Sequence, residues 1–280
     1  MADFSNILLA VDCDRTLTDV FGRIPARNLD AIRRFQENGG AFTVATGRSV
    51  PMFRPYFDQI PANAPFVLYN GAAFYDASSQ TLSDVVEIPG CAALIRTLQA
   101  RFPQLPLEVQ GEDYHYVFGD NPMRDAFYRF NHGAMKQITM DELPPVLPKL
   151  AIYTEFRDKT VKRFFAVEPE EAAQMDAVEQ FLAQSCADVV DPVRAAPGIL
   201  DIQARGVNKG AAARRLAARL GRGILVCAGD ALNDVSMLEE ADYSFVPSDC
   251  VAELRESRYP KVCPCGEGSV ADVIERLAAL

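Results

Sequence analysis

Acidic side chains stand directly after two apolar segments that lie far apart in the sequence. Asp12 and Asp14 follow an apolar run near the start of the chain, and Asp230 and Asp234 follow another near its end. Several carboxylates in a confined space repel one another unless a cation neutralises them. Oxygen ligands suit Mg²⁺, which keeps several of its waters and bridges to phosphate groups. These residue types therefore indicate a magnesium site that handles phosphate.

Two further side chains suit the oxygens of a phosphate group. Thr46 follows a third apolar run and offers a hydroxyl donor, and Lys209 begins a helical pattern and offers a positive charge. A carboxylate beside Mg²⁺ and a phosphate can act as a nucleophile. A second carboxylate two residues later, as Asp14 is to Asp12, can protonate a leaving oxygen and then activate water. We therefore expect phosphoryl transfer.

The elements that position these side chains form an alternating series. Short apolar runs at residues 7–11, 41–45, 66–69, 224–228 and 243–246 alternate with helical patterns. Such alternation predicts an α/β fold with a parallel sheet. In such sheets ligand sites gather beyond the carboxyl ends of the strands, so side chains far apart in sequence can converge there.

The middle of the chain, residues 72–205, has a different pattern, with more prolines, aromatic residues and alternating segments. Residues 73–85 and 107–118 each resemble a β-hairpin, because two strand-like runs flank a turn-forming segment. Further strands and a helix are expected at residues 150–154, 164–167 and 176–183. This pattern predicts a separate α+β unit inserted into a surface loop of the α/β domain.

The length, net charge and composition of the chain argue against some classes of function. The chain has 280 residues and a formal net charge of −10, which argues against a nucleic-acid partner because phosphate-backbone affinity comes from Lys and Arg. No apolar run approaches the roughly 20 residues of a membrane span, so we expect no membrane partner. The seven scattered cysteines and the absence of a signal pattern predict reduced thiols in a cytoplasmic protein.

Four motifs occur in order along the chain: Asp12-x-Asp14-x-Thr16, then Thr46, then Lys209, then Gly229-Asp230-x-x-Asn233-Asp234. They are accompanied by the segments ATGR (45–48), NGA (70–72), GVNKG (206–210) and GDALNDVSML (229–238). This set resembles the haloacid dehalogenase superfamily, and within it the Cof-type phosphatases. The resemblance implies a Rossmann-like doubly wound parallel sheet core at residues 1–71 and 206–280, with an inserted α+β cap at residues 72–205 that selects the substrate.

The resemblance also implies a role for each matching position. Asp12 is the nucleophile, and Asp14 is the general acid and base. Mg²⁺ is the cofactor, held by Asp12, Asp14 and Asp230. The phosphate is held by Thr46, Lys209 and Asn233. Supporting positions around the phosphate and the metal are Asp234, Gly47, Arg48 and Asn70.

We therefore expect a Mg²⁺-dependent phosphohydrolase of small phosphorylated metabolites, sugar phosphates being favoured, that forms an aspartyl-phosphate on Asp12. Asp14 favours ester hydrolysis, since an alkoxide leaving group needs a proton. A sugar phosphomutase of the same superfamily shares this pair and is the alternative enzyme. A non-catalytic protein that binds a phosphorylated ligand is the alternative from another class.

Some polar residues fall outside this scheme. Arg15 departs from the family pattern, which has glycine there, and glycine would suit a turn with positive φ. His115 and His132 lie in the predicted insert, where we expect structural roles rather than metal binding. The basic segment VKRFF (161–165) is interpreted as a solvated surface.

Overall fold

The computed structural model describes residues 2–119, 134–154 and 167–279. The predicted strand at residues 164–167, the segment VKRFF and His132 therefore lie wholly or largely outside the described residues. The chain divides into two compact units, which we describe separately: residues 1–47, 55–83 and 208–280 form the first, and residues 48–54 and 84–207 form the second. Within the described ranges no helix has the length and apolar character needed to cross a membrane.

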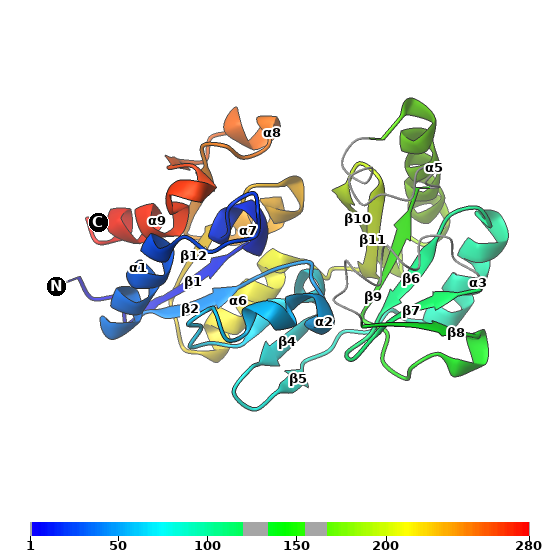
Figure 1. Cartoon of the computed structure of the whole chain (residues 1–280), viewed down its shortest axis with the longest axis horizontal. Helices are drawn as coiled ribbons and strands as arrows, with labels where there is room; N and C mark the ends of the chain where they lie inside the picture. The colour runs from blue at the N-terminus through cyan, green and yellow to red at the C-terminus, as the bar shows by residue number, and fades with distance from the viewer. Residues whose placement is uncertain (1, 120–133, 155–166, 280) are drawn as a thin grey trace. The chain divides into compact units, whose positions relative to one another are not determined.

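The first unit is built on a parallel sheet (Figure 1). Its strands among the described residues run in the order β14, β13, β12, β1, β2, with bounds Lys261–Val262, Tyr243–Pro247, Ile224–Ala228, Ile7–Val11 and Ala41–Val44. All neighbouring pairs are parallel, and β1 lies between β12 and β2. The parallel sheet confirms the predicted fold class, and it follows from strands that are apolar on both faces.

Helices cover both faces of this sheet. Helix α6 (Lys209–Arg219) packs its alanines and Leu216 onto the face that carries Leu8 and Ala10 of β1. Leu9 and Val11 point to the opposite face because side chains alternate along a strand. Helices α1 (Ala26–Glu37) and α9 (Ser269–Leu277) pack together and lie to one side of the sheet (Figure 1).

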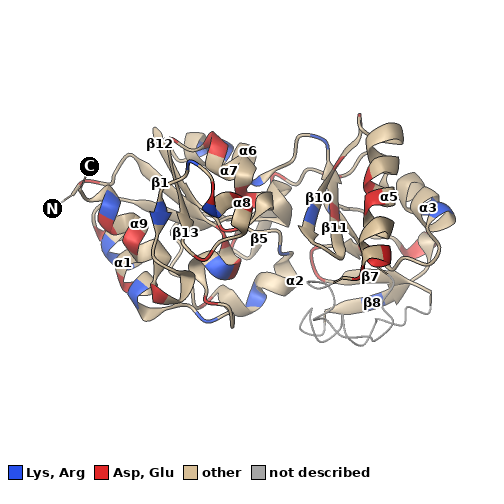
Figure 2. Ribbon diagram, turned by 90° about the horizontal axis from the view of Figure 1, so that it is seen from above, with Lys and Arg blue, Asp and Glu red and all other residues tan. Residues whose placement is uncertain are grey.

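Helices α1 and α9 both contain acidic and basic residues (Figure 2). Arg27 of α1 donates to the carboxylate of Glu275 in α9 at 2.8 Å and so ties the two helices together. The remaining short helices of this unit are α7 (Val235–Glu240) and α8 (Ala252–Arg255). Single turns of helix occur at Cys13–Leu17, Tyr69–Gly71, Leu232–Asp234 and Cys265–Glu267, labelled η1, η3, η6 and η7.

The hairpin predicted at residues 73–85 is present, and it belongs to the first unit rather than to the insert where the sequence placed it. Its strands are β4 (Ala73–Asp76) and β5 (Thr81–Ser83). Strand β4 pairs antiparallel with β3 (Phe66–Leu68), and β3 in turn continues the parallel sheet through a bridge between Ala45 and Val67. The hairpin lies with the first unit because this pairing joins it to β3.

The second unit contains an antiparallel-rich sheet that is separate from the first. Among its described residues the strand order is β10, β11, β9, β6, β7, β8, with bounds Val190–Ala196, Ile199–Ala204, Lys149–Tyr153, Leu107–Gln110, His115–Phe118 and Met135–Ile138. Only β7 and β8 pair in parallel there. Helices α3 (Cys91–Arg101) and α5 (Pro169–Ser185) supply much of its apolar core, which holds Leu98, Ile152 and Leu182.

This α+β unit with its own core confirms the predicted additional sheet. The hairpin of β6 and β7 occurs where expected, and the helix predicted at residues 176–183 lies within α5. The chain also adds a short segment to this unit from near its start, residues 48–54, which carries α2 (Val50–Phe53) and the beginning of the turn η2 (Arg54–Tyr56). The turn η4 (Met140–Glu142) completes the described elements.

Candidate active site

The sheet order of the first unit brings three polar loops to one edge. Strand β1 ends at Val11, and the backbone N–H of the next residue, Asp12, donates to the carbonyl of Ala228 at the end of β12, at 2.8 Å. On the other side, Ala45 after β2 donates to Val11 at 2.8 Å. Because parallel strands end at the same edge, the residues that follow β1, β2 and β12 meet there.

Three buried carboxylates meet in this place. The side chains of Asp12, Asp230 and Asp234 each offer an oxygen, and these oxygens lie within 4.8 Å of one another. Their exposed fractions are 6%, 4% and 0%. Asp14 is half-buried, and its charge adds to the repulsion felt by Asp12 and Asp230. The acids predicted from the motifs are therefore gathered as a cluster.

Lys209 supplies positive charge to two of these acids. Its ammonium Nζ lies 2.6 Å from Asp12 Oδ1 and 2.6 Å from Asp234 Oδ1, and the side chain is 1% exposed. Burial alone would lower the pKa of Lys209, but attraction to Asp12 and Asp234 outweighs burial and leaves the pKa above its ordinary value. Asn208, whose side chain accepts from the N–H of Ala211 at 2.8 Å, caps α6 and so sets the start of this helix.

The acids remain costly to ionise despite Lys209. Burial raises the pKa of Asp12 well above its usual range, and repulsion from the neighbouring acids adds to this, while Lys209 opposes it. Burial and the charge of Asp234 raise the pKa of Asp230 to about 7, against the attraction of Arg15 and Lys209. A divalent cation would relieve this repulsion, and buried carboxylate oxygens are the donors that Mg²⁺ prefers. The donor set therefore fits Mg²⁺.

The two oxygens of Asp234 are engaged within the protein. Oδ2 accepts the backbone N–H groups of Asp230 and Ala231 at 3.0 Å each, and Oδ1 accepts from Lys209. Asp234 therefore orients the loop after β12 and the lysine, and its supporting role toward the phosphate and the metal stays a prediction. Asp12 and Asp230 are the better candidates to reach a metal.

Two glycines allow these loops to approach so closely. A Cβ on Gly229 would lie 2.4 Å from Cβ of Asp234, and a Cβ on Gly210 would lie 2.1 Å from the carbonyl oxygen of Ser236. Both distances are shorter than real Cβ contacts show. Gly229 therefore allows Asp234 to approach the loop after β12, and Gly210 allows the backbone of Ser236 to approach α6.

The loop after β2 holds Thr46, Gly47 and Asn70 together. Thr46 is buried, its N–H donates to Val67 at 2.9 Å, and its carbonyl accepts from the N–H of Asn70 at 3.0 Å. A Cβ on Gly47 would lie 2.6 Å from Oδ1 of Asn70. Asn70 is buried and has a φ of 56°, a conformation that asparagine tolerates better than most residues.

Asn233 and Arg48 are the remaining predicted positions. Asn233 is half-buried in η6, one residue before Asp234. Arg48 falls in the second unit, where its guanidinium donates to the carbonyl of Met52 at 3.3 Å. The phosphate-binding roles of Thr46, Lys209 and Asn233 stay predictions, as do the supporting roles of Gly47, Arg48 and Asn70.

Arg15 and Asp249 are contacts of the site that no motif indicated. Arg15 has a φ of 59°, so its position does adopt the conformation that suits glycine. Its Nε lies 3.4 Å from Asp230 Oδ2, and its Nη2 donates to the carbonyl of Asp249 at 2.8 Å. The sequence indicated only that an arginine occupies a position where the family has glycine. It did not indicate that Asp230 and Asp249 are the partners of this arginine.

His115 lies in β7 of the second unit. Its ring nitrogens lie 2.5 Å from Ser49 Oγ and 2.5 Å from Glu108 Oε1, and the side chain is buried. These contacts tie β7 to β6 and to the start of α2. They agree with the structural role expected for this histidine.

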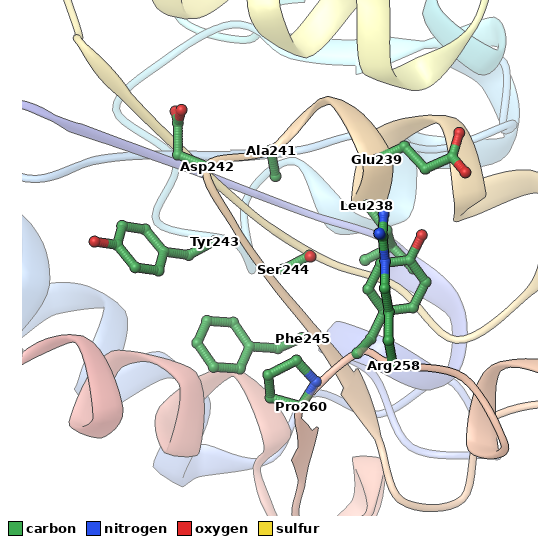
Figure 3. Close-up of a pocket in the computed structure, with 10 residues that line it drawn as sticks. Leu238, Glu239, Ala241, Asp242, Tyr243, Ser244, Phe245, Arg258 and Pro260 are labelled. Atoms are coloured by element: carbon green, nitrogen blue, oxygen red, sulfur yellow. The ribbon is translucent and has the colours of Figure 1, made fainter.

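A separate pocket of about 300 Å³ lies near β13, and Figure 3 shows its lining. The residues around it include Glu239, Asp242, Tyr243, Arg258 and Tyr259. None of the clustered acids and neither Thr46 nor Lys209 lines it. This pocket is therefore distinct from the acidic cluster.

Comparison with known proteins agrees with this geometry. The sequence model of the haloacid dehalogenase-like hydrolases matches residues 9–256. The chain is 25% identical over 275 residues to an HMP-PP phosphatase of Yersinia enterocolitica, covering 96% of this chain and 94% of that protein. It is also 25% identical over 241 residues to a 5-amino-6-(5-phospho-D-ribitylamino)uracil phosphatase of Bacillus subtilis, covering 84% and 83%.

Solved structures show the same fold. A haloacid dehalogenase-like hydrolase from Bacteroides thetaiotaomicron superposes with a TM-score of 0.79 at 20% identity, covering 96% of this chain and 98% of that one. Together these matches confirm the predicted family and the predicted enzyme class, a phosphatase. The chain therefore belongs to the haloacid dehalogenase-like hydrolases.

Proposed function

We propose that this enzyme is a Mg²⁺-dependent phosphatase of small phosphorylated metabolites that works through an aspartyl-phosphate on Asp12. The observation that carries the proposal is the buried cluster of Asp12, Asp230 and Asp234 with Lys209 bound between two of its members. A buried acid at the carboxyl end of a central strand, with a fixed cation against one oxygen, is suited to attack phosphorus.

The contacts of Asp12 indicate which of its two carboxylate oxygens would attack phosphorus. Oδ1 is held by Lys209 at 2.6 Å, so we assign the attack on phosphorus to Oδ2. Mg²⁺ held by Asp12, Asp230 and the backbone carbonyl of Asp14 would supply positive charge to the transferring phosphoryl group. Thr46, Lys209 and Asn233 are the residues that we propose for the phosphate oxygens.

Asp14 transfers a proton in each of the two steps of the proposed reaction. In the first, Oδ2 of Asp12 bonds to phosphorus, the ester bond breaks, and the leaving oxygen takes a proton from Asp14. In the second, a water bonds to phosphorus and gives a proton to Asp14, and the acyl phosphate breaks to restore the Asp12 carboxylate. The half-buried position of Asp14 supports this role, because such a group can meet both substrate and water.

The favoured substrates are sugar phosphates and related polyol phosphates. One relative removes the phosphate of a ribityl chain, and the other acts on HMP-PP, as their names state. We propose that residues 72–205, which include the hairpin of β4 and β5, select among such substrates. We place the reaction in the cytoplasm, which is supported by seven cysteines that are all free thiols.

A screen of phosphorylated metabolites with the purified protein and Mg²⁺ tests the proposal. We expect release of inorganic phosphate from at least one ester, and loss of release in Asp12→Asn and Asp14→Asn. Acid treatment of wild type during turnover should retain labelled phosphate on Asp12. Absence of release from every ester would contradict the proposal, and interconversion of sugar phosphates without free phosphate would indicate a mutase.

A further inference from the structure

Arg15 lies where three loops of the first unit meet. It belongs to the loop after β1, its Nε lies 3.4 Å from Asp230 in the loop after β12, and its Nη2 donates to the carbonyl of Asp249 after β13 at 2.8 Å. The side chain is 50% exposed, whereas that of Asp230 is 6% exposed. Arg15 thus reaches from the surface to a buried acid of the site.

The carboxylate of Asp230 has neighbours on both oxygens. The hydroxyl of Thr16 lies 3.4 Å from Oδ1, and Nε of Arg15 lies 3.4 Å from Oδ2. The backbone of Asp230 is fixed as well, since its N–H donates to Asp234 at 3.0 Å and its carbonyl accepts from Val251 at 3.0 Å. Among the described residues, Arg15 is the cationic side chain that makes an ion pair with Asp230, as Lys209 does with the other two acids.

The loop that receives Arg15 is itself anchored. The side chain of Asp249 accepts from the N–H of Cys265 at 2.9 Å and lies 3.1 Å from its thiol. The guanidinium therefore has a fixed acceptor that does not depend on Asp230. It can stay on the Asp249 carbonyl whether or not the carboxylate of Asp230 turns toward a metal.

The backbone gives no reason for an arginine at this position. A φ of 59° is the left-handed region, where a residue with a Cβ costs of the order of 1 kcal/mol more than glycine. The contacts of the Arg15 side chain with Asp230 and Asp249 compensate for this backbone cost. They place a permanent positive charge beside an acid that the proposed function assigns to Mg²⁺.

We propose that Arg15 is a positioning residue that holds the carboxylate of Asp230 in the metal-free enzyme and competes with the divalent cation for it. This inference rests on the proposed function for the identity of the cation. Two positive charges on one carboxylate repel, so the guanidinium weakens Mg²⁺ binding while keeping its ligand in place. Lys209 makes ion pairs with Asp12 and Asp234, and Arg15 makes the ion pair with Asp230, the third acid of the cluster.

Calorimetric titration of the full-length proteins with MgCl₂, without substrate, tests this inference. Arg15→Met keeps the Cβ, and with it the backbone cost, but removes the charge. We expect it to bind Mg²⁺ about tenfold more tightly than wild type, the effect of one partly screened charge near the ion. We also expect a lower midpoint of thermal unfolding in EDTA, because Asp230 loses its partner.

Two further variants separate charge from structure. Arg15→Lys keeps the charge and should bind Mg²⁺ within about threefold of wild type, since only the position of the charge changes. Arg23→Met removes an arginine of the same loop, whose partner is Asp19, and should leave Mg²⁺ binding unchanged. Unchanged or weaker binding by Arg15→Met, or equal tightening by Arg15→Lys, would overturn the inference.

The same measurements distinguish this inference from the proposed function. Tighter Mg²⁺ binding by Arg15→Met in a protein that releases no phosphate from any ester supports the role of Arg15 and contradicts the phosphatase mechanism. Phosphate release by wild type, combined with equal Mg²⁺ affinity in wild type and Arg15→Met, overturns the role of Arg15 and leaves the mechanism intact.

Discussion

Lys209 shows how one side chain can contact a proposed catalytic group and a structural group at once. Its ammonium bridges Asp12, the proposed nucleophile, and Asp234, which binds two backbone N–H groups of the loop after β12. All three side chains are buried. Removing one partner of such a set leaves charge without compensation in a medium of low polarity, which is more damaging than losing a surface ion pair.

We expect Lys209→Met to lower the free energy of unfolding at pH 8 by about 3–5 kcal/mol, because two buried carboxylates lose their cation. Urea unfolding of the metal-free proteins measures this. The matched control is Arg33→Met, which breaks an exposed ion pair with Asp30 and should cost under about 1 kcal/mol. Equal losses in the two variants would show that Lys209 is not an essential counter-charge.

The raised pKa of Asp230 predicts how stability depends on pH. Burial holds this pKa at about 7, above the ordinary value of about 4 for an unfolded chain. Between these values the folded state binds more protons than the unfolded state, so the free energy of unfolding should fall as pH rises from 4 to 7. Above pH 7 this contribution should be constant.

Denaturant unfolding in EDTA at pH 5, 6, 7 and 8 measures this dependence. Asp230→Asn, which has no titratable group at the position, should show a flatter curve over the same range. Mg²⁺ should restore more stability at pH 8 than at pH 5.5, since protons compete with the metal for the carboxylate. Parallel curves for wild type and Asp230→Asn would contradict the assignment.

At the scale of elements, the close packing of α6 against the start of α7 decides where Lys209 stands. Gly210 follows Lys209 in α6, and the space where its Cβ would lie is occupied by the backbone of Ser236 in α7. The same approach brings Asp234, which precedes α7, within reach of Lys209. A glycine inside a helix is unfavourable by itself, so its value here lies in the contact between the two helices.

Gly210→Ala should therefore destabilise the protein by about 1–3 kcal/mol, the usual cost of overpacking, although alanine favours helices. Thermal or urea unfolding measures the change. Ala218→Gly, at an exposed position of the same helix, should cost about 1 kcal/mol through helix propensity alone. A stabilised Gly210→Ala would mean that α6 and α7 have room to separate.

At the scale of the whole molecule, the chain builds two units with separate cores. The clustered acids and Lys209 come from the first unit, and the sheet of the second unit packs its own core with α3 and α5. Binding of a small cation at the cluster therefore concerns loops of the first unit. Its stabilising effect should be local, because a ligand stabilises the parts whose opening exposes its site.

Hydrogen exchange with and without Mg²⁺ checks this expectation. At a Mg²⁺ concentration one hundred times its dissociation constant, exchange that requires release of the metal should slow by up to about a hundredfold. We expect the slowing in residues 12–18 and 229–234, with rates in β9 and β11 changed by less than about twofold. Equal slowing throughout both units would show that they open together.

Much of the site was predictable from local patterns. Asp12, Asp14, Asp230 and Lys209 stand directly after buried strands or at the start of a helix, and motif spacing carries that information. Apolar runs of about five residues predicted β1, β2, β12 and β13 of the parallel sheet because both of its faces are covered, whereas the two-residue strand β14 was not predicted. Helix α3, and strands β8, β10 and β11 of the second unit, were not predicted, because their patterns are mixed and their pairing partners are distant in the sequence.

The sequence by itself predicted which acids and which lysine form the candidate site, and that Asp12 and Asp230 come at the ends of parallel strands. Only the tertiary structure decided that Lys209 bridges Asp12 and Asp234, that the hairpin of β4 and β5 joins the first unit, and that Arg15 reaches Asp230. The reason is physical. Residue type and spacing set local conformation, whereas the partner of a side chain depends on strand order and helix packing between distant segments, such as those of Arg15 and Asp249, which are 234 residues apart.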